Sequence, residues 1–342
     1  MGIRVLVVDD SALMRQVLSR FLTEAGMEVV GTARDGEEGL EKALALKPDV
    51  ITLDVEMPRK DGLTMLEELM AREPMPVVMV SSLTQKEAPA AIRALELGAM
   101  EVVAKPGGAI SLNLGEVREE IIRKVRGVAM ARMKRERSQV KGPTSLPRLP
   151  FCRLVVVGSS TGGPQTLVKL FSGLPGDFPA PVVVVQHMPR GLTASLAARL
   201  DNLSPLSVRE AEEGVIPRPG EVWVAPGGRH LVFRAGGAMA FSDDPPVHGV
   251  KPAVDVTLDS AVEVFGGHMV AVILTGMGMD GAKAALKLRE RGGFVMAQSE
   301  GSSIVYGMPR AAVELGAAHV SLDVEDMPAA LLHLVGKGRS HG

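Results

Sequence analysis

Short apolar runs alternate with stretches of helical periodicity along both halves of the chain. In the first half, the apolar runs are residues 3–8, 29–30, 50–53, 77–80 and 102–103. Between them, apolar side chains recur three or four positions apart, which is typical of helices that cover a sheet. Strands that alternate with helices predict a parallel, doubly wound sheet, so we expect the first half to be an α/β domain.

The second half repeats this alternation. Its apolar runs are residues 154–157, 181–185, 222–224, 269–274 and 294–297. Residues 254–265 have helical spacing, and residues 231–241 alternate weakly between apolar and polar, which predicts a hairpin. We therefore expect a second doubly wound α/β domain with a mostly parallel sheet.

A segment without periodicity separates the two halves. The chain has 342 residues, which is too long for one typical hydrophobic core. After a basic stretch with helical spacing, residues 134–150 lose all periodicity and contain three prolines, as linkers do. We predict a first domain at residues 1–125, a linker at 126–150 and a second domain at 151–342.

Composition and charge exclude several classes of protein. The net charge is −2 and aromatic residues make up 3%, so neither a basic field nor stacking platforms favour nucleic acid. No apolar run reaches about 18 residues, so no membrane span is expected. The single cysteine, Cys152, rules out an internal disulfide and fits a reducing compartment. The N-terminus enters a strand at once and is no secretory signal, so we expect a cytoplasmic protein.

Charged and hydroxyl side chains follow four predicted strands of the first domain. They are Asp9, Asp10, Asp54, Ser81 and Lys105. Open α/β sheets bind ligands at this edge, where three carboxylates repel one another unless a cation joins them. Hard oxygen ligands favour Mg²⁺, and an aspartate beside Mg²⁺ can attack a phosphoryl donor. The lysine and the hydroxyl would then hold the phosphoryl oxygens.

These residues, together with Met57-Pro58 and Asp61-Gly62, resemble the response-regulator receiver family. The resemblance implies a flavodoxin-like fold in which Asp54 accepts a phosphoryl group, with Mg²⁺ as the cofactor. It implies four contributors to the metal site, which are Asp10 directly, Asp9 through water, Asp54, and Glu56 through its carbonyl oxygen.

The same resemblance assigns roles at the remaining strand ends. Ser81 would be the switch hydroxyl, Lys105 would hold phosphoryl oxygens, and the Lys105–Pro106 bond would be cis, as is feasible only before proline. Receivers usually have an aromatic switch residue on the fifth strand, where this chain has Val102. This departure argues against an aromatic rotamer switch but not against phosphorylation.

The second domain opens with a strand, a tight turn and a helix at residues 154–171. Gly158, Ser160 and Gly162 fit the G-x-S-x-G pattern that exposes a serine hydroxyl between strand and helix. A plain tight turn, a phosphate cradle and a nucleophile seat are the three interpretations. A dinucleotide site would need an acid where the next strand ends in Gln186-His187, and a phosphate loop would need a lysine after Gly163. Both phosphate interpretations are therefore disfavoured.

A serine nucleophile needs a base and an orienting acid. His187 and Asp280 follow two other predicted strands, at the same sheet edge as Ser160. A plain histidine or a helix-capping aspartate remains the alternative for either residue alone, whereas the three together predict a catalytic triad. The order Ser, His, Asp differs from the order of α/β-hydrolases, which argues for a separate triad fold.

Five motifs in order carry a resemblance to the chemotaxis protein-glutamate methylesterase family, CheB. They are residues 158–163, 186–189, 225–230, 274–281 and 307–310. The resemblance implies hydrolysis of glutamate methyl esters on chemoreceptors, deamidation of receptor glutamines, and a chemotaxis histidine kinase as phosphodonor. It implies no esterase cofactor, an oxyanion contact from the Met277 N–H, and a positioning role for Thr161.

The chain departs from the family at two positions near these motifs. Family members often have a second histidine after His248, where Val250 stands here, and Met279 replaces a common asparagine. Neither position belongs to the triad, so the departures concern substrate contacts.

The tandem arrangement predicts regulation. We expect the unphosphorylated receiver to cover the esterase cleft and phosphorylation to move it away. One alternative is a response regulator whose second domain only binds a partner, and another is a DNA-binding output domain, which the neutral charge disfavours.

Overall fold

The computed structural model describes residues 2–82, 87–106, 114–132, 146–149 and 151–336. The chain forms two compact units, Met1–Arg135 and Glu136–Gly342. The predicted domain limit at residue 125 falls inside helix α5 (Leu114–Arg132), which continues into the segment expected to be linker. Most of the rest of that segment lies outside the described residues.

The first unit contains a parallel sheet whose described strands follow the order β2-β1-β3-β4-β5. The strands are β1 (Arg4–Val8), β2 (Glu28–Ala33), β3 (Val50–Asp54), β4 (Val77–Ser81) and β5 (Glu101–Ala104). Strands β3 and β4 are buried along their whole length, which explains their continuous apolar runs. The doubly wound fold expected for the first half is confirmed.

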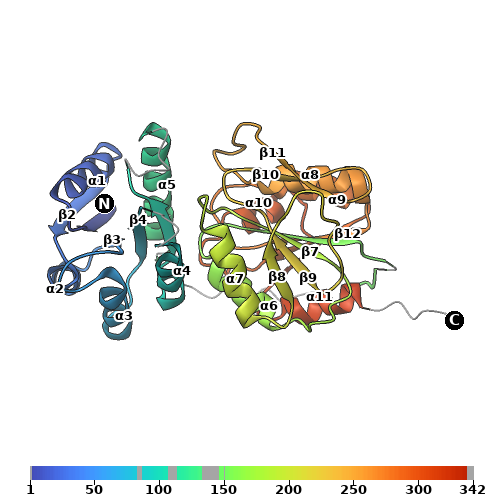
Figure 1. The fold of residues 1–342 in the computed structure, drawn as a ribbon, viewed down its shortest axis with the longest axis horizontal. Coiled ribbons are helices and arrows are strands. Elements are labelled where there is room, and N and C mark those ends of the chain that lie inside the picture. Colours follow the sequence, from blue (N-terminus) through green and yellow to red (C-terminus); the bar gives the residue numbers. More distant parts are fainter. Residues whose placement is uncertain (1, 83–86, 107–113, 133–145, 150, 337–342) are drawn as a thin grey trace. The chain divides into compact units, whose positions relative to one another are not determined.

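Helices cover both faces of this sheet (Figure 1). They are α1 (Ala12–Glu24), α2 (Gly36–Leu46), α3 (Gly62–Arg72), α4 (Ala88–Leu97) and α5. Helices α1 and α5 pack together on one face, and α2, α3 and α4 follow one another on the other. On the α1/α5 face the core includes Leu22 and Ile121, both fully buried.

The second unit contains a parallel sheet with the described strand order β14-β13-β12-β6-β7-β9-β8. The strands are β6 (Leu154–Ser159), β7 (Val182–Gln186), β8 (Ser207–Glu210), β9 (Glu221–Val224), β12 (Met269–Ile273), β13 (Phe294–Gln298) and β14 (Val320–Leu322). The expected hairpin is present as β10 (His230–Phe233) and β11 (Met239–Ser242), which pair antiparallel. The prediction of a second, mostly parallel α/β sheet is confirmed.

Helices also cover both faces of the second sheet (Figure 1). They are α6 (Gly163–Ser172), α7 (Thr193–Leu203), α8 (Val254–Phe265), α9 (Ala282–Glu290), α10 (Met308–Glu314) and α11 (Met327–Val335). Helices α8, α9 and α10 pack together, while α6 contacts α7 and α11. The core between α8 and the sheet includes Leu258, Val156 and Ile273.

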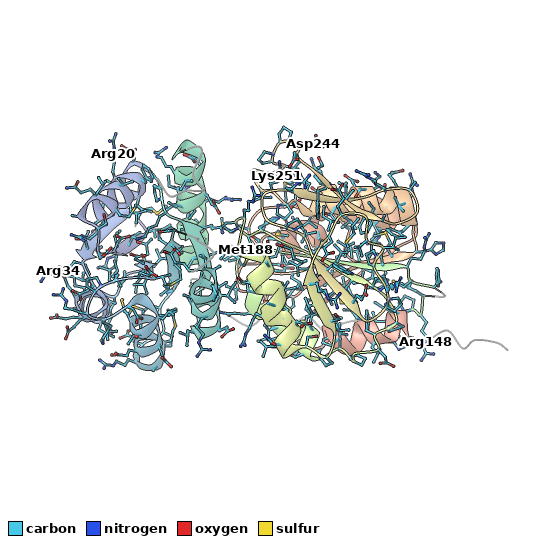
Figure 2. The ribbon with its side chains drawn as sticks, viewed as in Figure 1. Arg20, Arg34, Arg148, Met188, Asp244 and Lys251 are labelled. Carbon is cyan, nitrogen blue, oxygen red and sulfur yellow. The ribbon has the colours of Figure 1, made fainter. Side chains whose placement is uncertain are left out.

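Exposed charges are paired with nearby partners in much of the described surface. Arg20 and Arg34 point outward from the first unit (Figure 2), and each forms an ion pair with a glutamate four residues later. In both pairs the glutamate offsets the charge of the arginine. No helix within the described ranges is both long enough and apolar enough to span a membrane.

Candidate functional site

The first candidate site lies at the carboxyl edge of the first sheet. Asp9 follows β1 directly, Asp54 ends β3, and Lys105 follows β5. The Lys105 ammonium Nζ lies 2.6 Å from Asp54 Oδ2 and 3.1 Å from Asp9 Oδ2. The sequence prediction that these strand ends carry one group of side chains is therefore matched by their positions.

Burial controls the charge of this carboxylate group. Desolvation raises the pKa of Asp54 from 3.8 to about 6, against the lowering effect of the Lys105 ammonium. Burial lowers the pKa of Lys105, but the hydrogen bond and charge of Asp54 raise it overall. One lysine thus compensates two buried aspartates incompletely, and the group has an excess of negative charge.

The aspartates have the geometry of a cation site. Carboxylate oxygens of Asp9, Asp10 and Asp54 lie within 4.8 Å of one another. Among the described residues, Asp9 Oδ2 is buried and accepts no hydrogen bond, although the Lys105 ammonium is near. The Asp9 oxygen thus has one ion-pair partner in the described part of the chain, Lys105, which it shares with Asp54. Buried carboxylates with more negative charge than one lysine offsets suit a hard divalent cation, so these residues fit the expected Mg²⁺.

The loop after Asp54 explains the Asp61-Gly62 motif. The Asp61 side chain accepts the Thr64 N–H at 2.8 Å and caps α3. A Cβ at Gly62 would lie 1.9 Å from the backbone oxygen of Asp54, so only glycine lets the helix start this close. Glu56 lies in this loop, two residues beyond Asp54.

The remaining expectations for the first site have mixed outcomes. The Ser81 hydroxyl donates to Glu87 Oε2 at 3.0 Å. The expected cis bond at Lys105–Pro106 is wrong for this structure, because the cis bond found among the described residues is Lys251–Pro252. Val102, which stands where receivers usually have an aromatic residue, is buried in β5.

The second candidate site begins at the turn between β6 and α6. The Ser160 N–H donates to the carbonyl of Thr275 at 3.0 Å, and the Ser160 carbonyl accepts from Gly163 N at 2.7 Å. Gly162 has a φ of 76°, where a side chain is strained, and starts the helix as its N-cap. The turn thus fixes Ser160 by its backbone on both sides.

Gln186 holds this turn against the neighbouring strand. Its Nε2 donates to the carbonyls of Ser160 and His187, at 2.9 and 3.1 Å, and its Oε1 accepts the Ser159 hydroxyl at 2.6 Å. Sequence reasoning noted Gln186 as the absence of an acid at this strand end and as part of a family motif, and gave it no structural role. Its position beside His187 at the end of a fully apolar strand was the signal that could have shown its role.

His187 and Asp280 form a buried pair beside this turn. His187 Nε2 lies 2.7 Å from Asp280 Oδ2, and Ser159 and Gln186 are register partners in neighbouring parallel strands. Ser160 and His187 therefore continue adjacent strands at one sheet edge. Because Nε2 faces the aspartate, Nδ1 is the ring nitrogen left to exchange a proton.

Asp280 is held as an anion. Burial raises its pKa, but the hydrogen bond from His187 and the backbone N–H groups of Asp255 and Val254 lower the pKa below its usual value. Both N–H groups belong to the first turn of α8, where a negative charge is favoured by the helix dipole. The charged carboxylate can therefore fix the tautomer of the imidazole.

Two backbone N–H groups beside Ser160 are free to bind an anion. Within the described residues, the N–H groups of Thr161 and Met277 donate no hydrogen bond. A Cβ at Gly276 would lie 2.7 Å from Ser160 Cβ, which shows how closely the Met277 loop passes the serine. Unpaired donors next to a serine hydroxyl are the pattern expected of an oxyanion hole.

Comparisons with known proteins match both units of the chain. Residues 5–113 match the response regulator receiver domain and residues 155–331 match the CheB methylesterase domain. A protein-glutamate methylesterase/protein-glutamine glutaminase from Symbiobacterium thermophilum is 52% identical over 98% of each chain, and one from Archaeoglobus fulgidus is 49% identical over 92% of each.

A solved structure matches the second unit. The Thermotoga maritima CheB methylesterase catalytic domain is 47% identical, with a TM-score of 0.51, and the match covers 53% of this chain and 97% of that one. Both domain matches and the relatives that span almost the whole chain show that it belongs to the CheB methylesterase family, with an N-terminal response-regulator receiver domain.

Proposed function

We propose that this chain is a phosphorylation-regulated serine hydrolase that demethylates glutamate methyl esters on chemoreceptors and deamidates receptor glutamines. The names of its relatives give the substrate class. The observation that carries the proposal is the buried 2.7 Å contact between His187 and Asp280, at the strand end next to Ser160. A histidine oriented by a carboxylate beside a serine is the arrangement that activates a hydroxyl.

The proposed reaction has two halves, the formation of an acyl-serine and its hydrolysis. Ser160 Oγ attacks the ester carbonyl carbon while His187 Nδ1 accepts the hydroxyl proton, and Asp280 stabilises the imidazolium. The Thr161 and Met277 N–H groups bind the oxyanion. His187 then protonates the departing methoxide, and methanol leaves an acyl-serine. Water deprotonated by His187 releases glutamate, and with glutamine as substrate the leaving group is ammonia.

The receiver supplies control. We propose that Asp54 accepts a phosphoryl group from the chemotaxis histidine kinase and that Asp9, Asp10, Asp54 and the Glu56 carbonyl hold Mg²⁺. A bound Mg²⁺ would offset the charge of the phosphoryl oxygens. Lys105, already 2.6 Å from Asp54, would pair with those oxygens, and Ser81 would turn from Glu87 toward them. Both reactions take place in the cytoplasm.

The test is methanol release from methylated chemoreceptor membranes, with and without a small phosphodonor and Mg²⁺. We expect release that rises with phosphodonor, loses that rise in Asp54→Ala, and falls at least about 10⁴-fold in Ser160→Ala. Release by folded Ser160→Ala at the wild-type rate would remove the serine mechanism. Absence of release from the wild-type protein on its own receptors would favour an output domain that only binds a partner.

A further inference from the structure

Helices α8 and α9 cap each other through two aspartates. Their own N-cap residues, Ala253 and Gly281, provide no side-chain cap. Asp280, two residues ahead of α9, accepts the first two N–H groups of α8 at 2.6 and 2.9 Å. Asp255, in the first turn of α8, accepts the Ala284 N–H in the first turn of α9 at 3.0 Å. The position of the triad aspartate therefore depends on Asp255.

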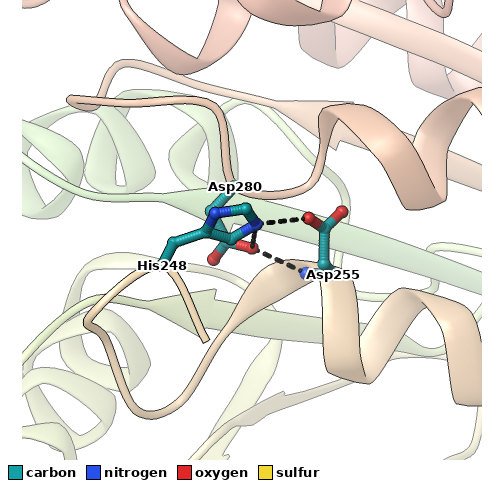
Figure 3. A group of neighbouring side chains, drawn as sticks. All are labelled: His248, Asp255 and Asp280. Atoms are coloured by element: carbon teal, nitrogen blue, oxygen red, sulfur yellow. Dashed lines mark hydrogen bonds and ion pairs between the residues drawn. The ribbon is translucent and has the colours of Figure 1, made fainter. Parts of the chain in front are cut away.

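His248 is the third member of this group (Figure 3). Its Nε2 lies 2.8 Å from Asp255 Oδ2 and 3.9 Å from Asp280 Oδ1. Hydrogen bonds in both directions between Val247 and Val250 close the loop around it. The His248 side chain is 27% exposed, whereas those of Asp255 and Asp280 are 9% and 2% exposed. His248 thus covers the buried aspartates from the solvent side.

His248 partly offsets the burial of Asp255. Burial, and to a smaller extent the nearby Asp280 carboxylate, raise the pKa of Asp255 overall, against the lowering effect of the Ala284 N–H and His248. Every carboxylate oxygen of the two aspartates accepts a hydrogen bond from a described residue. Without His248, Asp255 Oδ2 would lose its donor beside a second carboxylate. The Asp255 side chain would then protonate or turn, and the start of α8 that holds Asp280 would move with it.

We propose that His248 and Asp255 are positioning residues for the hydrolysis, a second histidine–aspartate pair that fixes the triad aspartate through the reciprocal caps of α8 and α9. The proposal rests on the proposed function. Among the described residues, the His248 and Asp255 side chains form hydrogen bonds and ion pairs with each other, with Asp280 and with the Ala284 N–H, whereas it is His187 that shares Oδ2 of Asp280 with the Val254 N–H. Their removal acts on the orientation of the His187 ring, so the expected loss is in kcat and not in substrate binding.

The experiment measures kcat and KM for methanol release by full-length variants on methylated receptor membranes. We expect His248→Ala to lower kcat about 10- to 100-fold with KM within about twofold. His248→Gln, which keeps a donor near the position of Nε2, should recover most of the loss. His268→Ala is the matched control, because His268 is exposed and lies before β12, at the opposite end of that strand from the site.

Asp255→Asn keeps the side-chain shape and the acceptor for Ala284 but presents an amide to His248. It should lower kcat as His248→Ala does, and the double variant should be no worse than the more impaired single one. The proton resonance of His187 Nε2–H should shift in both variants and not in His268→Ala. These readouts separate positioning from a general loss of folding, because an unfolded variant would lose all His187 signal and would not keep the wild-type KM.

Three results would overturn the proposal. The first is a folded His248→Ala with kcat within twofold of wild type. The second is a loss confined to KM, which would make His248 a receptor contact. The third is additive losses in the double variant. Ser160→Ala measured in parallel keeps the two ideas apart, because undiminished release by that variant removes the serine mechanism whatever His248 does.

Discussion

Each unit has one aspartate on which its candidate site depends, Asp54 in the first and Asp280 in the second. The two differ in which groups stabilise the charge of the carboxylate. Both are buried at the carboxyl edge of a parallel sheet. Burial raises the pKa of Asp54 to about 6 despite Lys105, whereas three hydrogen-bond donors lower the pKa of Asp280 in spite of its burial. The first unit leaves negative charge for a cation to neutralise, and the second satisfies it with its own helix and histidine.

This difference fits the two chemistries. A phosphoryl acceptor must hold a dianionic group that comes and goes, so a site that is complete without Mg²⁺ would have no place for it. A triad aspartate has to remain charged through every turnover, so permanent protein donors serve it better than an exchangeable ion. Substitutions that change the hydrogen-bond donors or acceptors of either site test this contrast.

Among changes to the donors and acceptors of these two aspartates, the largest expected effect is on catalysis, from Asp280→Asn. The amide keeps the size of the side chain but has one acceptor oxygen. It therefore cannot replace both Oδ2, which meets His187 Nε2 and the Val254 N–H, and Oδ1, which accepts the Asp255 N–H. We expect kcat to fall about 10³- to 10⁴-fold. Methanol release measures this, with Trp223 fluorescence to verify the fold of the same unit. More than a tenth of wild-type activity would contradict the role of Asp280.

Two glycines offer the next comparison, because a Cβ at either would lie 1.9 Å from an oxygen. At Gly62 this oxygen is the backbone carbonyl of Asp54, which cannot move alone. Gly62→Ala should therefore destabilise the receiver by about 2–3 kcal/mol. Hydrogen exchange in β1 and β3 measures this, with Trp223 fluorescence unchanged. Equal protection from exchange in the variant and the wild type would show that the loop can move to accommodate the added methyl group.

At Gly163 the oxygen is Oε1 of Gln186, the tip of a side chain. Gly163→Ala should displace Gln186 from the carbonyls of Ser160 and His187, lowering kcat about 10- to 100-fold with a stability loss of about 1 kcal/mol. Gln186→Glu is the control, since it removes the Nε2 donor without adding bulk. If the two variants differ widely in kcat, displacement of Gln186 does not explain the loss of activity in Gly163→Ala.

Asp54→Asn should stabilise the Mg²⁺-free receiver at neutral pH. Because the folded pKa of Asp54 is raised from 3.8 to about 6, the folded wild type binds more protons than the unfolded chain between these values, and its stability falls as the pH rises through them. The variant lacks this fall and should be more stable by about 1–3 kcal/mol at pH 7.5. Hydrogen exchange of β3 in EDTA measures it. Equal stability at both ends of this range would contradict the raised pKa.

The sequence was sufficient for the groups that follow strands and insufficient for those that depend on how helices cross. Asp54, Lys105, Ser160, His187 and Asp280 each follow or end an apolar run, and parallel strands bring such positions to one edge. Strands β8 and β14 were not predicted, since each is an edge strand with a single buried residue that gives no periodic signal.

The contact between His248 and Asp255 could not be predicted from the sequence either. Seven positions separate these residues, and the loop between them includes a cis bond at Lys251–Pro252 that no pattern indicated. The role of Asp255 depends on α9 starting beside α8, a contact between segments almost thirty residues apart. Propensity and periodicity describe each helix alone, so the reciprocal caps appear only when both are packed.

The smallest predicted effect concerns Mg²⁺ affinity and pH. Mg²⁺ needs ionised aspartates, and Asp54 with a pKa of about 6 is largely protonated at pH 5 and largely charged at pH 7. The association constant should therefore rise about tenfold over this range and level off above it. Titration calorimetry measures it, with Asp54→Asn as the control that loses the rise. A constant affinity from pH 5 to 7 would mean that Asp54 is already charged, and the contrast with Asp280 would then lie in the missing donor at Asp9 and not in the charge of Asp54.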